Sequence, residues 1–352
     1  MKKKLFRFVV SETETISRAH KKMLRNKKGI ILVYNNDKKI IGLVSDGDFK
    51  RAFWSNIDQQ NPISSIGKKK KFFFINSKKN LNRNNSLPAN INHVPVIKNG
   101  KLTDIIFNIN EIKKIKSKIK SFSVVVLAGG YGRRLKPITN SIPKALVKIN
   151  NKTIFELIIN KFKKYKIDKI YLALFHKKEM IKSYVKKKGF KKMKFIEEKK
   201  RTGTAGPLAN INFKKEKSPI IVTNCDTIIN YEYNEILKFH ISNSNLITIV
   251  GFLHEQNINY GVCEVTNQGK LTSLIEKPKI KLLANCGFYV ISPEIIRYIK
   301  KNIFLDMDVF IKKIIKKGYK IGVYPIPEEN CIDIGTLEKY QKFNKKSRIL
   351  KK

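Results

Sequence analysis

The sequence predicts an α/β protein, with a C-terminal, doubly wound, mostly parallel sheet of the Rossmann type and a smaller N-terminal α+β module. The chain has 352 residues, enough for two or three domains. Its first 120 residues or so repeat a unit of helices and paired strands, whereas the remainder alternates single strands with helices. The remainder opens on 123–127, an apolar β-branched run typical of a strand buried on both faces.

The N-terminal part contains one helix–strand–turn–strand–helix unit and a weaker copy of it. Apolar spacing and turn residues place the first copy's helices at 15–26 and 49–54 and its strands at 30–34 and 40–44. Asn35-Asn36-Asp37 and Ser45-Asp46-Gly47-Asp48 are the predicted turns. The weaker copy has predicted strands at 93–97 and 102–107.

This repeated unit resembles a tandem pair of CBS (cystathionine-β-synthase) modules, through the segment Ile40–Arg51. The resemblance implies that Ser45 and Asp48 hold the ribose of an adenine nucleotide. The second copy departs from the pattern, because the corresponding positions carry Asp104, Phe107 and Asn110. A purely structural or dimerising module is an equal alternative. We therefore expect one CBS module at 1–57, a degenerate second at 58–118, and the main domain at 119–352.

The main domain is predicted to follow a βαβα order. After the strand at 123–127, the expected elements are a helix at 154–166, a strand at 169–174, a helix near 177–188, and strands near 194–196 and 220–224. This order favours a mostly parallel sheet covered by helices on both faces. Sites in such sheets lie beyond the carboxyl ends of the strands.

The charge of the chain is strongly positive. Lys and Arg number 74 against 27 Asp and Glu, which gives a formal net charge of +47. The lysines are spread along nearly the whole length, and no helix-turn-helix, zinc-finger or RNA-binding aromatic pattern accompanies them. We therefore expect a solvated basic surface that draws in anionic small molecules, and no specific nucleic-acid site.

The sequence also bears on location and on the state of the thiols. No stretch approaches the roughly 18 consecutive apolar residues of a membrane span, and the basic start lacks the apolar core of a secretion signal. The four cysteines are far apart, without the spacing of a zinc site or a redox pair. We expect a cytoplasmic protein with unpaired thiols.

The richest motif follows the first strand of the main domain. It runs from Leu127 to Pro137, with glycines at 129, 130 and 132, and Pro143-Lys144 comes shortly after. Such glycines let backbone N–H groups approach a polyphosphate, and the nearby cations supply charge where a phosphoryl group would transfer. The motif is not a Walker loop, because no Gly-Lys-Ser/Thr follows.

These residues closely resemble the signature of sugar-1-phosphate nucleotidyltransferases, and the likeness extends over about 123–340. Later motifs of that family follow in order: Gly203-Thr204-Ala205-Gly206-Pro207-Leu208, Asn224-Cys225-Asp226, Tyr260-Gly261-Val262, Glu276-Lys277-Pro278, Asn285-Cys286-Gly287 and Asp333-Ile334-Gly335-Thr336. Three positions depart from common family residues, namely Ala145, Pro207 and Cys225. None of these departures removes a charged group, so we expect activity to be retained.

The resemblance implies a role for each motif. Nucleotide binding is implied for Leu127, Ala128, Gly129, Gly130, Gly132, Arg133, Gly203 and Thr204. Catalytic charge is implied for Arg134, Lys144 and Lys277, and sugar binding for Gly261, Glu276 and Asn285. Asp226 and Asp333 are the implied ligands of Mg²⁺, a cation that prefers oxygen donors and few carboxylates. Glu197 and Glu198, just before the base-reading loop, are further candidates for contact with base or ribose.

The expected reaction joins a sugar 1-phosphate to a nucleoside triphosphate and releases diphosphate. The attacking phosphate is already anionic, so no protein base is required, and none of the five histidines lies in a motif. The CBS-bearing architecture resembles glucosamine-1-phosphate guanylyltransferases of nonulosonate (legionaminate) biosynthesis, which tilts the expectation toward GTP.

Several alternatives stay open. The same chemistry could act on heptose or mannose 1-phosphate with GTP, or use UTP, CTP or dTTP with another sugar. The chain could instead be a catalytically inactive nucleotide sensor, or a basic RNA-binding protein recognised by a steep salt dependence. Homo-oligomerisation is a further expectation that the sequence does not decide.

Overall fold

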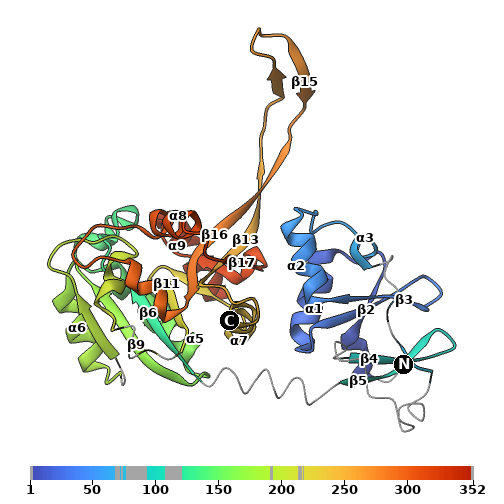
Figure 1. Ribbon diagram of the computed structural model, residues 1–352, viewed down its shortest axis with the longest axis horizontal. Coiled ribbons are helices and arrows are strands. Elements are labelled where there is room, and N and C mark those ends of the chain that lie inside the picture. The colour runs from blue at the N-terminus through green and yellow to red at the C-terminus, as the bar shows by residue number, and fades with distance from the viewer. Residues whose placement is uncertain are drawn as a thin grey trace. The chain divides into compact units, whose positions relative to one another are not determined.

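The computed structural model describes residues 3–67, 72, 74–76, 93–107, 121–190, 193–212, 216 and 218–349. The chain divides into two compact units, Met1–Lys118 and Ile119–Lys352 (Figure 1). Each unit has its own apolar clusters. Positions 108–120, which include Asn110, lie outside the described residues.

The first unit is built on a three-stranded sheet and a separate hairpin. Its elements are η1 (Lys3–Phe8), β1 (Val9–Ser11), α1 (Ile16–Asn26), β2 (Ile30–Tyr34), β3 (Ile40–Ser45), α2 (Asp46–Trp54), α3 (Ser64–Gly67), β4 (His93–Lys98) and β5 (Lys101–Phe107). β1 pairs with β2 in parallel, β2 with β3 antiparallel, and β4 with β5 antiparallel. The order of elements agrees with the predicted repeat, including its weaker second pair of strands.

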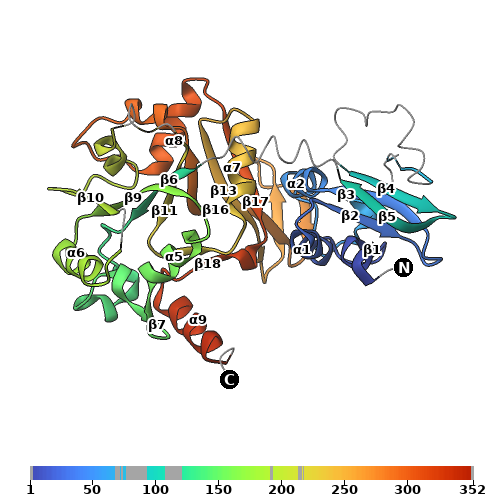
Figure 2. The same ribbon diagram turned by 90° about the horizontal axis from the view of Figure 1, so that it is seen from below.

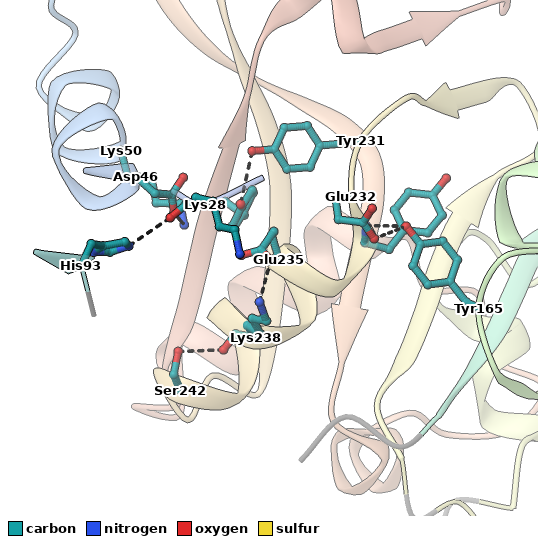
Figure 3. A network of polar contacts seen from close by, with 12 residues as sticks. Lys28, Asp46, Lys50, His93, Tyr165, Tyr231, Glu232, Glu235, Lys238 and Ser242 are labelled. Atoms are coloured by element: carbon teal, nitrogen blue, oxygen red, sulfur yellow. Dashed lines mark hydrogen bonds and ion pairs between the residues drawn. The ribbon is translucent and has the colours of Figure 1, made fainter. Parts of the chain in front are cut away.

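Both helices of the first copy start at a side-chain cap. The Thr15 hydroxyl accepts from the Arg18 N–H, and Ser45 and Asp48 form a capping box at the start of α2. The prediction of a turn over 45–48 was wrong, because this box lets the helix begin at Asp46. His93, the first residue of β4, contacts the Lys28 carbonyl oxygen through Nε2 at 3.0 Å (Figure 3). This contact holds the start of β4 next to the turn before β2.

The second unit is centred on a seven-stranded mixed sheet. The strands lie in the order β10 (Met193–Glu197), β9 (Ile167–Leu174), β6 (Phe122–Leu127), β11 (Ile220–Asn224), β16 (Lys279–Ile291), β13 (Ile247–Asn257) and β17 (Ile321–Ile326). β16 runs antiparallel to both of its neighbours, and every other pairing in this sheet is parallel. The predicted mostly parallel sheet is confirmed.

Helices cover both faces of this sheet, as a doubly wound fold requires. One apolar cluster includes residues of α5 (Ile154–Phe162), α6 (Lys178–Lys187) and α7 (Tyr233–Ser242). The other includes residues of η6 (Gly206–Asn210), η8 (Pro293–Tyr298) and α8 (Met307–Lys316). Figure 2 shows α5 and α8 on opposite sides of the strands. Side chains alternate along β6, so Val124 and Val126 join the first cluster and Val125 joins the second.

Smaller elements complete the second unit. They are η3 (Arg133–Leu135), η4 (Ile138–Asn140), η5 (Lys144–Leu146), β7 (Lys148–Ile149), β8 (Lys152–Thr153), β12 (Thr227–Ile229), β14 (Val262–Val265), β15 (Leu271–Ile275), η9 (Glu328–Asn330), β18 (Cys331–Asp333) and α9 (Leu337–Ile349). Glu232, the residue before α7, accepts a hydrogen bond of 2.6 Å from the Tyr165 hydroxyl (Figure 3). This bond ties the start of α7 to the segment that follows α5.

One part of the second unit projects beyond the sheet. The β13–β16 ladder continues from Ile247↔Ile291 out to Asn257↔Lys279, and the β14–β15 hairpin follows at its end. Figure 1 shows this ribbon extending away from the rest of the unit. We call residues 253–283 the arm. Among the described residues, no helix is long and apolar enough to cross a membrane.

Candidate active site

A cavity lies where the carboxyl ends of β6, β9 and β11 meet. The register sets this edge, because Leu127 at the end of β6 is paired with both Ala173 and Asn224. The cavity is lined by Leu127, Gly129, Gly130, Gly132, Arg133, Arg134, Lys144, Ala173, Phe175, Glu198, Arg201, Gly203, Thr204, Pro207, Asn224, Cys225, Asp226 and Gly335. Most of the predicted nucleotide-binding residues are therefore together at the predicted edge of the sheet.

The glycines of the first loop serve different purposes. Gly132 has a φ of +68°, and a Cβ there would lie 2.8 Å from the Thr139 methyl carbon, so the fold itself requires glycine. At Gly130 an added Cβ would meet no protein atom within 4 Å. The open space beside Gly130 belongs to the cavity. Ala128, in contrast, is 3% exposed and packs in the core instead of lining the cavity.

The two predicted metal-binding acids are brought together by chain segments far apart in sequence. β12 and β18 pair with Thr227 opposite Asp333, and the Ile334 N–H donates to the Asp226 carbonyl at 2.9 Å. A Cβ built on Gly335 would lie 2.8 Å from Asp333 Oδ1 and 2.9 Å from Asp226 Oδ2. The two carboxylates thus face the same small space, which only glycine at 335 leaves open.

Basic side chains neutralise these acids. The Lys144 ammonium is paired with Asp226, and the Lys339 ammonium with Asp333. An Arg134 guanidinium nitrogen would lie 3.3 Å from the same Cβ position on Gly335. Burial raises the pKa of Asp333, but the bonds from Lys339 and the Gly335 N–H outweigh it, so the pKa lies below its usual value. Asp333 is therefore ionised at neutral pH.

This donor set fits a divalent cation of the magnesium type. The Asp226 and Asp333 carboxyl groups converge beside the cavity, and Mg²⁺ is commonly held by one or two carboxylates with substrate phosphates completing its shell. No group of three or more His, Cys, Asp or Glu side chains with metal-binding geometry occurs in the described part of the chain. Burial raises the pKa of the Cys225 thiol to about 12, so this cavity-lining group is neutral.

The loop after β10 forms a separate wall of the cavity. Glu198 accepts bonds of 2.9 Å from both the N–H and the hydroxyl of Thr202 through one oxygen, Oε2. Burial raises the pKa of this carboxyl group, although the Thr202 bonds act in the opposite direction. Arg201 lines the cavity beside it, with its guanidinium 5.7 Å from the centre of the Phe304 ring. An acidic and a basic side chain therefore border this wall.

The second half of this loop is held from a distant part of the chain. Asp306 accepts from the Thr204 N–H at 3.0 Å, and the Met307 N–H donates to the Thr204 hydroxyl at 2.7 Å. A Cβ on Gly203 would lie 2.5 Å from the Leu305 carbonyl oxygen. Sequence reasoning missed Asp306, because it lies 102 residues from Thr204 and outside every motif.

The predicted sugar-binding residues do not line this cavity, and neither does Lys277, which was predicted to supply catalytic charge. Gly261, Glu276 and Lys277 lie on the arm, where a Cβ on Gly261 would be 2.9 Å from Glu276 Oε2. Asn285 lies on β16 near the root of the arm, and its amide donates to the Tyr289 hydroxyl at 2.9 Å. The structure thus brings Gly261 and Glu276 together, apart from the residues that line the cavity.

Ser45 and Asp48, the candidate nucleotide-binding residues of the first unit, form hydrogen bonds with each other. Asp48 Oδ2 accepts from the Ser45 hydroxyl at 2.7 Å and from its N–H at 2.9 Å. The other Asp48 oxygen is paired with Arg51. Both side chains therefore stabilise the start of α2, whatever else they bind.

Comparison with known proteins agrees with this geometry. Residues 123–348 match the nucleotidyl transferase family, and residues 1–55 match the CBS domain. The chain belongs to the nucleotidyl transferase family. The predicted family and the N-terminal CBS domain are both confirmed.

Relatives of this nucleotidyl transferase include two named sugar-phosphate enzymes. A putative mannose-1-phosphate guanyltransferase of Sulfolobus acidocaldarius is 32% identical over 233 residues, 65% of this chain and 64% of that protein. Mannose-1-phosphate guanyltransferase of Saccharomyces cerevisiae is 33% identical over 186 residues, 50% of this chain and 51% of the yeast protein. The chain thus spans between half and two thirds of these relatives. The crystal structure of HddC from Yersinia pseudotuberculosis has 26% identity and a TM-score of 0.49, over 64% of this chain and 98% of HddC.

Proposed function

We propose that this nucleotidyl transferase joins a sugar 1-phosphate to a nucleoside triphosphate and releases diphosphate. The preferred triphosphate is GTP. One observation carries the proposal. Arg134, Lys144, Asp226 and Asp333 converge around Gly335, beside the glycine loop at the carboxyl edge of the sheet. Such an arrangement of cations and carboxylates suits a polyphosphate and its metal ion.

The bond changes are those of a phosphoryl-type displacement. An oxygen of the sugar phosphate attacks the α-phosphorus and forms a new P–O bond, while the bond from the α-phosphorus to the bridging oxygen breaks. The bridging oxygen keeps the electron pair and leaves with diphosphate. Arg134 and Lys144 stabilise the charge that accumulates on the leaving group, and the reaction relies on positioning rather than on a protein base.

A magnesium ion would be held by Asp226 and Asp333. When bound, it supplies charge neutralisation at the phosphate oxygens. Lys144 keeps the Asp226 carboxylate oriented toward the cavity through its ion pair, and Lys339 does the same for Asp333. The contact with Lys339 also lowers the pKa of Asp333, which favours the ionised form that a cation requires.

The wall formed by the loop after β10 favours guanine. Guanine presents two neighbouring N–H donors, N1–H and N2–H, which a carboxylate accepts together, and its O6 and N7 accept from a guanidinium. Glu198 and Arg201 provide this pair of charges. Uracil offers one such donor, and adenine places an amino group where guanine has O6. The guanyltransferase names of the two relatives point in the same direction.

The sugar phosphate is assigned to the motifs of the arm and its root. Glu276 and Asn285 would orient sugar hydroxyls, Gly261 would leave room for the ring, and Lys277 would hold the phosphate. The proximity of Gly261 to Glu276 supports a shared role for these two. For the CBS unit we propose an adenine nucleotide as ligand, near Ser45 and Asp48.

The test is a diphosphate-release assay with a panel of triphosphates and sugar phosphates in the presence of Mg²⁺. The panel pairs GTP, UTP, CTP and dTTP with mannose, glucosamine and heptose 1-phosphates. We expect turnover with GTP and one of these sugars. Tight nucleotide binding without turnover on any pair would replace the enzyme with a nucleotide sensor, and turnover only with a pyrimidine nucleotide would overturn the assignment of guanine.

A further inference from the structure

The cavity at the carboxyl edge of the sheet contains an aromatic side chain to which the proposed reaction gives no role. Phe175 directly follows β9 and is half-buried. Among the described residues that line the cavity, it is the one aromatic side chain. Most of its neighbours there are glycines or carry polar or charged groups. An apolar ring facing such a polar cavity calls for a physical reason.

The apolar core does not supply that reason. Leu172 and Leu174, which precede Phe175 on β9, are buried in the first apolar cluster of the second unit. Phe175 packs in neither cluster of this unit, as far as the described residues show. Its ring instead leaves apolar surface open to the cavity, and a ligand that covers such surface gains affinity.

Phe175 lies between the glycine loop and the wall formed by the loop after β10. On one side, a Cβ built on Gly129 would lie 3.2 Å from the Phe175 Cβ. On the other side, the Glu198 N–H donates to the Leu174 carbonyl at 3.0 Å, so the chain after β10 continues alongside the end of β9. Phe175 is therefore flanked by the loop proposed to bind phosphates and by the carboxyl group proposed to bind the base.

The pleat of the sheet directs Phe175 and Glu198 to the same face. Tyr171 and Ala173 of β9 pack in the second apolar cluster together with Ile196 of β10. Side chains two residues apart along an extended strand share a face, so Phe175 follows Ala173 and Glu198 follows Ile196. Both Phe175 and Glu198 line the cavity. The ring and the carboxyl group thus border the same space.

A second aromatic ring holds Phe175 in place. Tyr131 packs against Phe175 edge to face, with ring centres 6.0 Å apart and an angle of 88° between the planes. Tyr131 also contacts the His176 ring at 4.9 Å, and the Arg133 guanidinium lies 5.4 Å from the centre of the Tyr131 ring. These contacts fix the orientation of the Phe175 ring before a ligand arrives, which lowers the entropic cost of binding.

A nucleobase presents the flat π surface that such a ring binds. Hydrogen bonds from its edge to Glu198 and Arg201 lie in the plane of the base and leave both of its faces free. Stacking on an aromatic side chain tolerates any base, because every base has a π face. Edge contacts therefore select the base, whereas an aromatic ring adds affinity that depends little on its identity.

We propose that Phe175 is a substrate-binding residue that stacks on the nucleobase of the bound triphosphate. This role rests on the proposed function, because it requires the base to lie beside Glu198. Phe175 contacts a face of the base, while charged side chains bind its edge and the phosphates.

The first experiment titrates the full chain with GTP in a calorimeter, with Mg²⁺ and without sugar phosphate. Phe175→Leu should raise the Kd for GTP by roughly 10- to 100-fold, and Phe175→Tyr should keep the wild-type affinity. Inorganic triphosphate has no base, so its affinity should be the same in Phe175→Leu as in the wild type. The matched control is Phe195→Leu, at a half-buried phenylalanine of β10 that does not line the cavity, and it should bind GTP normally.

The second experiment detects the contact by fluorescence. The chain has a single tryptophan, Trp54, which belongs to the first unit. In a Trp54→Phe background, Phe175→Trp places the chain's one indole ring at the cavity. GTP should quench its emission by stacking, and inorganic triphosphate should not.

Three results would overturn the stacking contact. They are an unchanged Kd for GTP in Phe175→Leu, an equal loss of affinity for GTP and inorganic triphosphate in that variant, and indole emission that GTP does not alter. A wild-type chain that binds neither GTP nor any other nucleoside triphosphate would overturn the proposed function together with this role. The two failures are therefore distinguishable.

Discussion

Lys144 and Asp226 form an ion pair within the cavity, with side chains only 11% and 13% exposed. Water screens such a pair poorly, so each charge depends on the other for its stability. The pair also fixes the Asp226 carboxylate opposite Asp333, beside Gly335. One lysine therefore serves both the fold and the placement of the proposed metal-binding acids.

Asp226→Asn should lower kcat for diphosphate release by about 100-fold or more, because it removes a charge from the proposed metal site. The amide oxygen can still accept from Lys144, but the largely buried ammonium loses its counter-charge, so the melting temperature should also fall and kcat is measured well below it. The matched control is Asp168→Asn, an exposed acid at the start of β9 that should leave kcat unchanged. A near wild-type rate in Asp226→Asn would place the metal elsewhere.

Glu198→Gln should lower kcat/KM for GTP by roughly 10- to 100-fold, since an amide loses one acceptor for the paired N–H groups of guanine. Its effect on other triphosphates should be smaller. Glu197→Gln, at the last residue of β10, is the neighbouring control, because the Glu197 carboxylate pairs with Lys178 and Lys182 and does not line the cavity. Equal losses for all triphosphates would mean that Glu198 only positions the loop.

Millimolar AMP or ATP should raise the melting temperature of the first unit in the full chain, and Asp48→Ala should abolish that shift. Because Asp48 caps α2, this variant should also have a lower melting temperature without ligand. The free energy of unfolding should fall by about 1 kcal/mol. Asp46→Ala, which breaks the Lys50 pair on the same helix, should keep the nucleotide response. No response in the wild type would leave the CBS unit structural.

The sequence was most informative where function depends on a local motif. The glycine loop and Asp226 could be predicted because each follows a strand with a clear apolar pattern, and the Asp333-Ile334-Gly335 segment because it resembles a family motif. Asp306 could not, because its role arises only from the packing of the loop before α8 on Thr204. The projecting ladder of β13 and β16 was equally hidden, since strand periodicity does not reveal where a strand leaves its sheet.

Gly130→Ala distinguishes an effect on ligand binding from an effect on stability. Since an added Cβ meets no protein atom within 4 Å, the melting temperature should be unchanged, while KM for GTP should rise because the methyl group obstructs the approach of a phosphate. Gly132→Ala should behave differently and lose stability, owing to its positive φ and its contact with Thr139. An unchanged KM in Gly130→Ala would show that the triphosphate does not approach this loop.

His240 makes the second unit sensitive to mild acid. It is buried between the hydroxyls of Thr248 and Ser292, at 2.9 and 3.1 Å, and burial lowers its pKa to about 4. The unfolded chain takes up this proton near pH 6.5, so between these values it binds more protons than the folded chain. The free energy of unfolding should therefore fall as the pH drops through this window, by up to about 3 kcal/mol.

Urea unfolding of the second unit at pH 7 and pH 5 measures the change. His240→Gln should remove most of it, and His254→Gln, on the exposed root of the arm, should retain it. A wild-type slope that survives in His240→Gln would assign the acid sensitivity to other groups.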